Sequence, residues 1–231
     1  MRGMEQPKQY QLIDYLSGFA TPKRLERFEE VLSARTRYIT VALENIFQGH
    51  NASAVLRSME CIGIQDIHVI ENEYAYQVNP EIALGASKWL TVIRHSQRSD
   101  NTADAVHRIR EKGYRIVATT PRRDAVAMDA FDLEKGPAVF FFGTELEGLS
   151  DAMLSLADEH VRIPICGFTE SFNVSVSAAL VMHPLAQKLR KSPSIPWRLS
   201  KAEKQALRLE WLKQSVRRSD LLIRRFFTAG S

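Results

Sequence analysis

The run PAVFFFG, residues 137–143, constrains the fold more than any other segment of this chain. A strand that is apolar on both faces must be covered on both, which is typical of a parallel sheet between two helical layers. Around this run the hydrophobic periodicity alternates between that of strands and that of helices. Strands are predicted at 38–45, 66–71, 90–95, 114–120, 137–143 and 160–165. Helices are predicted at 22–35, 51–63, 103–113, 149–158 and 171–190. The pattern predicts an α/β fold, a parallel sheet with helices on both faces.

Capping residues set several of the expected helix limits. Thr21, Asn51 and Ser200 are expected N-caps, because a short polar side chain can accept a hydrogen bond from a free N–H of the first turn. Gly63 is expected to end the helix that Asn51 begins. Pro184 is expected to kink its helix or to lie near its boundary, because proline cannot donate the helical hydrogen bond.

Four turns are candidates for a ligand site, because ligands of such sheets bind beyond the carboxyl ends of the strands. They are residues 44–51, 119–124, 142–148 and 165–171. Gly143 and Gly148 would let the third turn approach a ligand closely, and Gly167 repeats that arrangement in the fourth. Two such turns could wrap a flat polar ligand such as an adenosine; ordinary strand-to-helix turns are the alternative. The sequence lacks the dinucleotide-binding, P-loop and nucleophile-elbow motifs.

Charge is unevenly distributed along the chain, although its net value is only +4 over 231 residues. Residues 1–40 carry a net +2, residues 41–189 a net −6 and residues 190–231 a net +8. This asymmetry favours a polyanion that the terminal segments dock onto a central site. A basic helix that is simply solvated is the alternative.

Cysteine usage and hydropathy bear on the compartment. Cys61 and Cys166 lie far apart and match no metal-binding spacing, and the six histidines form no pair at helical spacing. No run of about 18 apolar residues suggests a membrane span, and the first residues have no apolar signal-peptide core. We therefore expect a reduced, cytoplasmic protein without a structural metal.

Three segments resemble the motifs of the SPOUT-class RNA 2′-O-ribose methyltransferases, in their TrmH (SpoU) family. They are HNASAVLRSMECIG (50–63), FFFGTELEGLS (140–150) and IPICGFTESFNVSVSAALV (163–181), in the expected order and spacing. The third is the most specific, because it sets S-x-N-V-S after a strand and a glycine turn. The resemblance covers about residues 22–190.

The resemblance implies a SPOUT-type parallel sheet with a deep C-terminal trefoil knot, about residues 137–190. It also implies an N-terminal helical arm at 1–37, a methyltransferase domain at 38–191 and a basic C-terminal helical arm at 192–231. The small polar residues at the start of the helix at 171 would then bond to loop backbone, cofactor or a second subunit. A homodimer is expected, since these enzymes complete the site across two knotted domains.

The implied reaction transfers a methyl group from S-adenosyl-L-methionine to a ribose 2′-hydroxyl of tRNA, at the D-loop guanosine (position 18 in tRNA numbering). Arg57 resembles the family's catalytic arginine, and Asn51, Glu145, Ser171 and Asn173 match its other motif positions. Because a guanidinium is effectively never deprotonated in proteins, Arg57 is expected to hold an RNA phosphate that relays the hydroxyl proton. Asn51 could instead only cap its helix, and Glu145 could hold Arg57 or a backbone amide.

Two further sets of residues follow from the resemblance and the charge pattern. The implied cofactor-binding positions are Thr119, Gly143, Ile163, Ile165 and Phe172. The residues expected to bind RNA phosphates are Arg198, Lys201, Lys204, Arg208, Arg217 and Arg218, with Arg224 and Arg225. Two other functions stay open, which are ribosomal RNA ribose methylation and RNA binding without catalysis. The family's ribosomal RNA enzymes usually carry a larger N-terminal RNA-binding domain, so the roughly 35 residues before the first strand favour tRNA.

Overall fold

The computed structural model describes residues 6–229 except 47, 76, 78, 99 and 123. The chain divides into two compact units. We call residues 36–197 the sheet unit, and the segments up to 35 and from 198 together the helical unit. The first five residues of the expected N-terminal arm lie outside the described residues, as do Phe47 and Arg123 of two expected ligand turns.

A parallel seven-stranded sheet forms the centre of the sheet unit, with the order β3-β2-β1-β6-β4-β7-β5. The strands are β1 Ile39–Glu44, β2 Asp66–Ile70, β3 Thr91–His95, β4 Arg115–Thr119, β5 Val126–Ala127, β6 Ala138–Phe142 and β7 Glu159–Arg162. This confirms the α/β fold and the six predicted strands. The prediction missed β5, because two residues are too short to show a period of two.

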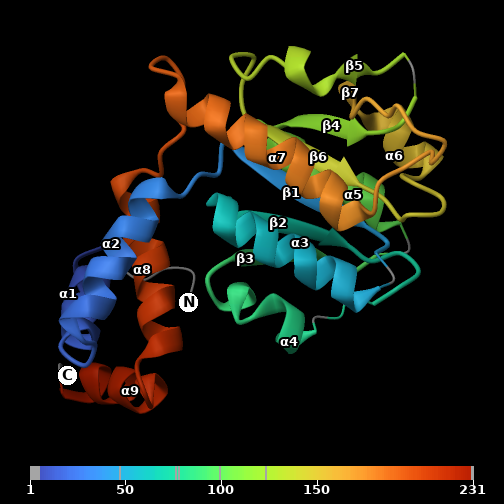
Figure 1. The fold of residues 1–231 in the computed structure, drawn as a ribbon. Coiled ribbons are helices and arrows are strands. Elements are labelled where there is room, and N and C mark those ends of the chain that lie inside the picture. The colour runs from blue at the N-terminus through green and yellow to red at the C-terminus, as the bar shows by residue number, and fades with distance from the viewer. Residues whose placement is uncertain are drawn as a thin grey trace. The chain divides into compact units, whose positions relative to one another are not determined.

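Helices cover both faces of the sheet (Figure 1). On one face α3 (Gly49–Ile62) and α7 (Val174–Lys191) pack on a core that includes Phe140 and Phe142. On the other, α5 (Asn101–Glu111) and α6 (Asp151–Leu156) pack on Phe141. Successive side chains of a strand point to opposite faces, so the apolar run in β6 contributes to both cores. The short helices are α4 Pro80–Ala83, η1 Ala86–Lys88 and η2 Met128–Ala130.

Two helix starts that involve candidate site residues differ from the prediction. Helix α3 begins at Gly49 with Gln48 at its N-cap, so the expected cap Asn51 lies inside the first turn. Its side chain is bonded elsewhere, as described below. Helix α7 begins at Val174, after the N-cap Asn173. Ser171 therefore precedes the helix that it was predicted to open.

Two other helix signals can be compared directly with the structure. Gly63 ends α3 in the left-handed conformation, with φ +86°, as expected. Pro184 lies inside α7 rather than near either end. It is exposed, while Leu185 and Val181 are buried beside it. Packing of those neighbours continues the helix past the missing N–H, so of the two alternatives, a kink or a nearby boundary, the boundary is not observed.

The helical unit contains α1 (Gln6–Ser17), α2 (Pro22–Ala34), α8 (Lys201–Ser215) and α9 (Ser219–Ala229). Thr21 and Ser200 cap α2 and α8 as expected, and Ser200 forms a capping box with Glu203. The ring of Phe28 meets that of Trp211 edge-on at 5.4 Å, which joins the two ends of the chain. The segment expected to form a basic helical arm contains two helices, α8 and α9, separated near Arg218, whose φ is +57°. No helix among the described residues is long and apolar enough to cross a membrane.

Candidate active site

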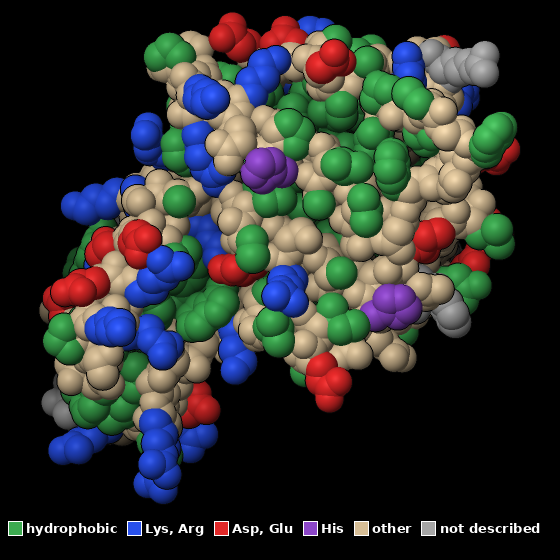
Figure 2. Space-filling view, viewed as in Figure 1, with side chains coloured by type: hydrophobic (Ala, Val, Ile, Leu, Met, Phe, Trp, Pro, Cys, Tyr) green, Lys and Arg blue, Asp and Glu red, His purple; other side chains and the backbone are tan. Residues whose placement is uncertain are grey.

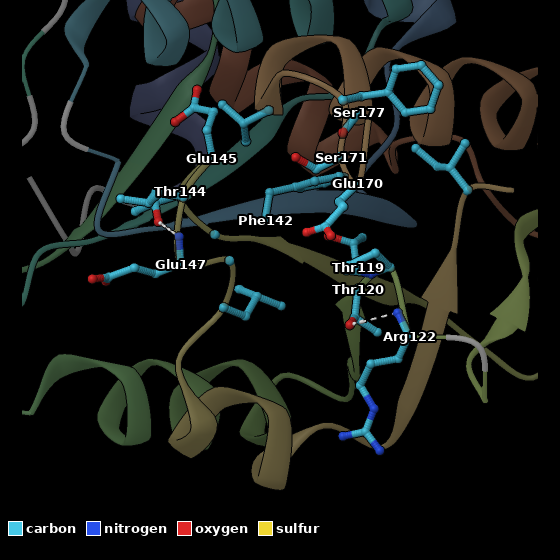
Figure 3. Close-up of a pocket in the computed structure, with 18 of the residues that line it drawn as sticks. Thr119, Thr120, Arg122, Phe142, Thr144, Glu145, Glu147, Glu170, Ser171 and Ser177 are labelled. Atoms are coloured by element: carbon cyan, nitrogen blue, oxygen red, sulfur yellow. Dashed lines mark hydrogen bonds between the residues drawn. The ribbon is translucent and has the colours of Figure 1, made fainter. Parts of the chain in front are cut away.

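A cavity of about 480 Å³ opens at the carboxyl ends of β4, β6 and β7 (Figure 3). Its walls come from three of the four predicted turns, those at 119–122, 142–149 and 163–172, and from the first turns of α7. The structure therefore places a ligand-sized cavity where the rule for parallel sheets expects one.

The turn after β6 is closed on itself. Thr144 and Gly148 exchange two backbone hydrogen bonds, of 3.0 and 3.1 Å, and Gly148 has φ +74°. A Cβ atom on Gly143 would lie 1.9 Å from the carbonyl oxygen of Gly148. The close approach that Gly143 permits is thus to the chain's own backbone. Only glycine fits this position, and it fixes the shape of one cavity wall.

The segment after β7 is held much less firmly. Residues 164–173 are all exposed, among them Phe168 at 109% and Phe172 at 40%. Within the described part of the chain, no hydrogen bond involves residues 164–172. Ile165 and Phe172 nevertheless contribute apolar surface to the cavity. This wall lacks the polar contacts that fix the wall opposite.

Three side chains from the three motifs form one hydrogen-bonded cluster. The Nδ2 of Asn51 donates to Glu145, and to the Oε1 of Gln48 at 2.9 Å. The Nδ2 of Asn173 donates to the Oδ1 of Asn51 at 3.1 Å and is 3.5 Å from the Oε1 of Glu145. The Oδ1 of Asn173 accepts from the N–H of Ser175 at 2.9 Å. The carboxylate of Glu145 thereby lies against two side-chain amides. Among the described residues it binds neither of the partners expected for it, Arg57 or a backbone amide.

Carboxylates dominate the charged groups of the cavity. Glu145, Glu147 and Glu170 line it, while Arg122 is the one Lys or Arg among the described lining residues. Arg122 is bonded to Asp124 at 2.8 Å, and this hydrogen bond raises the pKa of Arg122 and lowers the pKa of Asp124. With its arginine already paired, the cavity favours a ligand that carries positive charge.

All five predicted cofactor positions line this cavity, as Thr119, Gly143, Ile163, Ile165 and Phe172. Two predicted catalytic residues, Glu145 and Ser171, line it as well. Asn51 and Asn173 reach it through Glu145. Arg57 is exposed on α3 and is not among the lining residues.

The structure adds lining residues that the sequence did not single out. They are Thr120, Pro121, Arg122, Glu147, Glu170 and Ser177, with several apolar neighbours. Thr119 donates its hydroxyl to the carbonyl of Phe141 at 2.7 Å, which ties the turn after β4 to β6. Most of the missed residues lie inside turns that were predicted to bind a ligand. The turn, rather than the individual side chain, was therefore the signal in the sequence.

The residues expected to bind RNA all belong to the helical unit. Lys201, Arg217 and Arg218 are exposed, and blue side chains are spread over this unit in Figure 2. Arg208 differs, because its guanidinium is half-buried and forms an ion pair with Glu29. Burial lowers the pKa of Arg208. This arginine has a structural contact that the sequence did not reveal.

The fold and the cavity define a class of protein, an α/β sheet protein whose small-ligand site is built from strand-end turns. Residues 38–183 match the model of the SpoU rRNA Methylase family. The chain belongs to this methyltransferase family.

Similar proteins support this assignment over most of the chain. It is 42% identical to a protein of Borreliella burgdorferi named tRNA (guanosine(18)-2′-O)-methyltransferase, over 89% of this chain and 91% of the relative. A Thermus thermophilus protein of the same name is 32% identical over 84% of this chain and 98% of the relative. The solved Aquifex aeolicus TrmH/SpoU tRNA modifying enzyme superposes with a TM-score of 0.74 at 28% identity, over 84% of this chain and 97% of that one. The methyltransferase AviRb of Streptomyces viridochromogenes, solved with AdoMet, shares the fold at 20% identity and a TM-score of 0.55, over 71% of this chain and 62% of that one.

Proposed function

We propose that this protein methylates the ribose 2′-hydroxyl of guanosine 18 in tRNA, with S-adenosyl-L-methionine as methyl donor. The observation that carries the proposal is the meeting of three motifs at one cavity, through Asn51, Glu145 and Asn173. The relatives that match most of the chain bear the name of this activity. The three motifs lie in the sheet unit, and the similarity to these relatives extends beyond it, over 89% and 84% of the chain.

The cavity fits the proposed cofactor. Gly143 leaves its wall without a side chain, Ile165 and Phe172 offer apolar surface for an adenine, and three carboxylates suit a sulfonium. Backbone groups of the 142–149 turn and of 163–172 are proposed to bind the adenosine. The bound cofactor would supply an electrophilic methyl group. The chain's own contribution is to align the ribose hydroxyl with it, and alignment of this kind supplies much of the acceleration in two-reactant chemistry.

We propose that the ribose hydroxyl gives its proton to an RNA phosphate held by Arg57, and that the phosphate passes this proton to solvent water as the methyl group is transferred. A guanidinium remains protonated, but it binds phosphate in a bidentate manner. Arg57 is exposed, and its side chain has no hydrogen-bond partner among the described residues, so its guanidinium is free to meet a phosphate. It follows Asn51 by six residues in α3, or about 9 Å along the helix axis. Asn51, Glu145, Ser171 and Asn173 would hold the reacting ribose and the cavity wall in place.

The role of Arg57 can be separated from cofactor binding. In Arg57→Ala we expect turnover to fall by about 100-fold or more, as in other losses of a transition-state contact, with unchanged affinity for S-adenosyl-L-methionine by calorimetry. Lys135→Ala, which removes an exposed cation of the same unit, is the control for loss of one surface charge. Unchanged turnover in Arg57→Ala would remove this residue from the mechanism.

A homodimer and the knot are part of the proposal. Val176 and Leu180 of α7 are each 44% exposed and lie one turn apart, and Figure 2 shows hydrophobic side chains gathered on the face that carries α7 and α3. Covering this apolar face by a second subunit would bring further groups to the site. The threading of about residues 137–190 into a trefoil is proposed from the family. The same holds for the arms at 1–37 and 192–231 beside a domain at 38–191, and for a cytoplasmic location.

The basic helices are proposed to bind tRNA phosphates through Arg198, Lys201, Lys204, Arg208, Arg217 and Arg218. The exposed members of this set give the proposal its support. Arg208 would have to exchange its ion pair with Glu29 for a phosphate, so we expect it to contribute least.

Methyl transfer from labelled S-adenosyl-L-methionine to unmodified tRNA transcript tests the function, with the product nucleotide mapped. The expected product is 2′-O-methylguanosine at position 18. Transfer to ribosomal RNA but not to tRNA would replace the substrate and keep the reaction. Cofactor binding without transfer to either RNA would favour the non-catalytic alternative.

A further inference from the structure

Glu44 is a buried carboxylate that the proposed reaction does not use. It is the last residue of β1 and is 2% exposed. Its Oε1 accepts the hydroxyls of Thr102 at 2.7 Å and of Ser150 at 2.8 Å, and its Oε2 accepts the backbone N–H of Ser150 at 2.9 Å. Among the described residues it forms no ion pair. Burying a carboxylate without a cation is costly, so a role that needs all three hydrogen bonds would explain its presence.

Two of the three hydrogen bonds end on Ser150, the residue that directly follows the glycine-bounded turn of the cavity. Ser150 is also the N-cap of α6, since its hydroxyl accepts from the N–H of Met153 at 3.1 Å. The single hydrogen of that hydroxyl is donated to Glu44, so Glu44 fixes the orientation in which the oxygen accepts the N–H of Met153. The end of the turn is held in this way to the end of β1.

The beginning of the same turn is held to β1 as well. Leu43 of β1 pairs with Phe142 of β6 in the parallel ladder, immediately before Gly143. The two ends of the turn, Phe142 and Ser150, thus share neighbouring anchors, the backbone of Leu43 and the carboxylate of Glu44. Glu44 itself is not among the residues that line the cavity. Any effect it has on a ligand must pass through the turn.

We infer that Glu44 is a positioning residue for the cofactor cavity, which it shapes by holding Ser150. The inference rests on the proposed function, because it takes the ligand to be S-adenosyl-L-methionine. Backbone groups of the 143–149 turn bind a ligand well only when their spacing is set in advance, since a wall that must first be ordered lowers affinity. Loss of the carboxylate leaves the turn intact through its own Thr144–Gly148 bonds but releases its far end.

Thr102 provides an internal control. Its hydroxyl binds the same Oε1 of Glu44, but it lies at the start of α5 and also accepts from the Nδ2 of Asn72 at 2.9 Å. It is not among the cavity residues. Thr102→Val removes one of the three bonds to Glu44 without touching the turn, so it reproduces the loss of stability but not the loss of positioning.

The test compares Glu44→Gln, Ser150→Ala and Thr102→Val in the full chain. Affinity for S-adenosyl-L-methionine is measured by calorimetry, and its KM and kcat with unmodified tRNA. Glu44→Gln and Ser150→Ala are each expected to weaken binding and raise KM about tenfold, the size of one lost charge-assisted hydrogen bond, with kcat within about threefold. When Glu44→Gln and Ser150→Ala are combined, the loss of affinity is expected to be about that of the weaker-binding single variant. Both changes break the same contact, so their effects do not add. Thr102→Val is expected to bind like the wild type.

Two results would overturn the inference: unchanged affinity in a folded Glu44→Gln, or a loss in Thr102→Val equal to that in Glu44→Gln. If Glu44→Gln does not fold, the cofactor affinities of Ser150→Ala and Thr102→Val are compared instead. A wild-type chain that binds S-adenosyl-L-methionine but methylates no RNA would refute only the proposed function. The cofactor affinities of the variants would still test the role of Glu44. A wild type that does not bind it would refute both.

Discussion

Asn173 donates its side-chain N–H to Asn51 at 3.1 Å, although 122 residues separate them in the chain. One residue caps α7 and the other lies in the first turn of α3, so the bond joins the ends of two helices that pack side by side. Glu145 accepts from Asn51 and completes the contact with the turn after β6. Substitution of any one of these three residues should therefore alter the hydrogen bonds and positions of the other two.

Replacing Glu145 by glutamine should break the hydrogen bonds that hold Asn51 and Asn173 to the turn after β6. In Glu145→Gln an amide N–H can face the amide donors of Asn51 and Asn173, which leaves donors unsatisfied at a cost of about 1–3 kcal/mol. We expect kcat/KM for tRNA to fall roughly 10- to 100-fold. The matched control is Asp151→Asn, an exposed acid in the first turn of α6, with an expected change below about threefold. Equal activities of the two variants would contradict a role for the cluster.

Gly143→Ala should damage both the fold and the cavity. The new Cβ would lie 1.9 Å from the oxygen of Gly148, and backbone must move to relieve the clash. We expect the free energy of unfolding to fall by about 3 kcal/mol, measured by urea denaturation, together with loss of cofactor binding. In Gly18→Ala of the helical unit the nearest atom would lie at an ordinary 3.4 Å, so binding should be retained. Normal stability of Gly143→Ala would show that the turn can open.

Cofactor binding should order the segment 164–172. Its residues are exposed, and in the described chain they make no hydrogen bonds, so their amides should exchange quickly in the free protein. Addition of S-adenosyl-L-methionine is expected to slow this exchange by about tenfold or more, measured by mass spectrometry. The strand β6 serves as an internal reference that stays protected throughout. Equal exchange with and without cofactor would exclude this segment from the binding site.

The buried pair His68 and His95 should make the protein sensitive to acid. Their ring nitrogens lie 3.0 Å apart, and burial, followed by the charges of His95 and Lys112, lowers the pKa of His68 from 6.5 to about 3. At pH 5 the unfolded chain therefore binds a proton at this position that the folded chain does not. Stability falls as pH decreases below 6.5, by about 2 kcal/mol between pH 7 and pH 5.

Urea denaturation at pH 7 and pH 5 measures this difference. In His68→Gln the pH-dependent loss should shrink by most of that amount, because glutamine does not titrate. His183→Gln, an exposed histidine of α7, should keep the wild-type pH dependence. A wild type with equal stability at the two pH values would show that the pair takes up a proton without cost.

Phosphate contacts by the helical unit should appear in the salt dependence of tRNA binding. Each lost contact lowers the slope of log K against log salt by about 1. Lys201→Gln and Arg217→Gln are each expected to show this decrease. Arg208→Gln should leave the slope nearly unchanged, since Arg208 is paired with Glu29. A slope of zero in the wild type would exclude electrostatic docking by these helices.

Hydrophobic periodicity predicted the sheet well because the central strand β6 is continuously apolar and its neighbours β1 and β4 are largely so. It missed β5, whose two residues gain their strand conformation only from pairing with β7. It also placed the start of α3 at Asn51, because the side chain of Asn51 is typical of an N-cap. In the structure Asn51 bonds to Glu145, from a distant part of the chain, and Gln48 occupies the cap position. Local propensity cannot anticipate such a tertiary partner.

The site was predictable at the level of turns and motifs. Strand-end glycines and the resemblance indicated five residues that all line the cavity. The role of Glu44 was hidden, because a single acid at the end of an apolar strand reads like any turn residue. Its burial and its bonds to Ser150 depend on the three-dimensional pairing of β1 with β6.

The helical unit brings α1 and α2 together with α8, through contacts such as that of Phe28 with Trp211. A ribosome makes the first two helices long before it makes the third, and the whole sheet unit is synthesised in between. Through most of translation α2 therefore lacks the partner that covers its apolar side. The nascent chain must keep that surface from aggregating, and the helical face that we propose binds tRNA can assemble only after about residue 211 has left the exit tunnel.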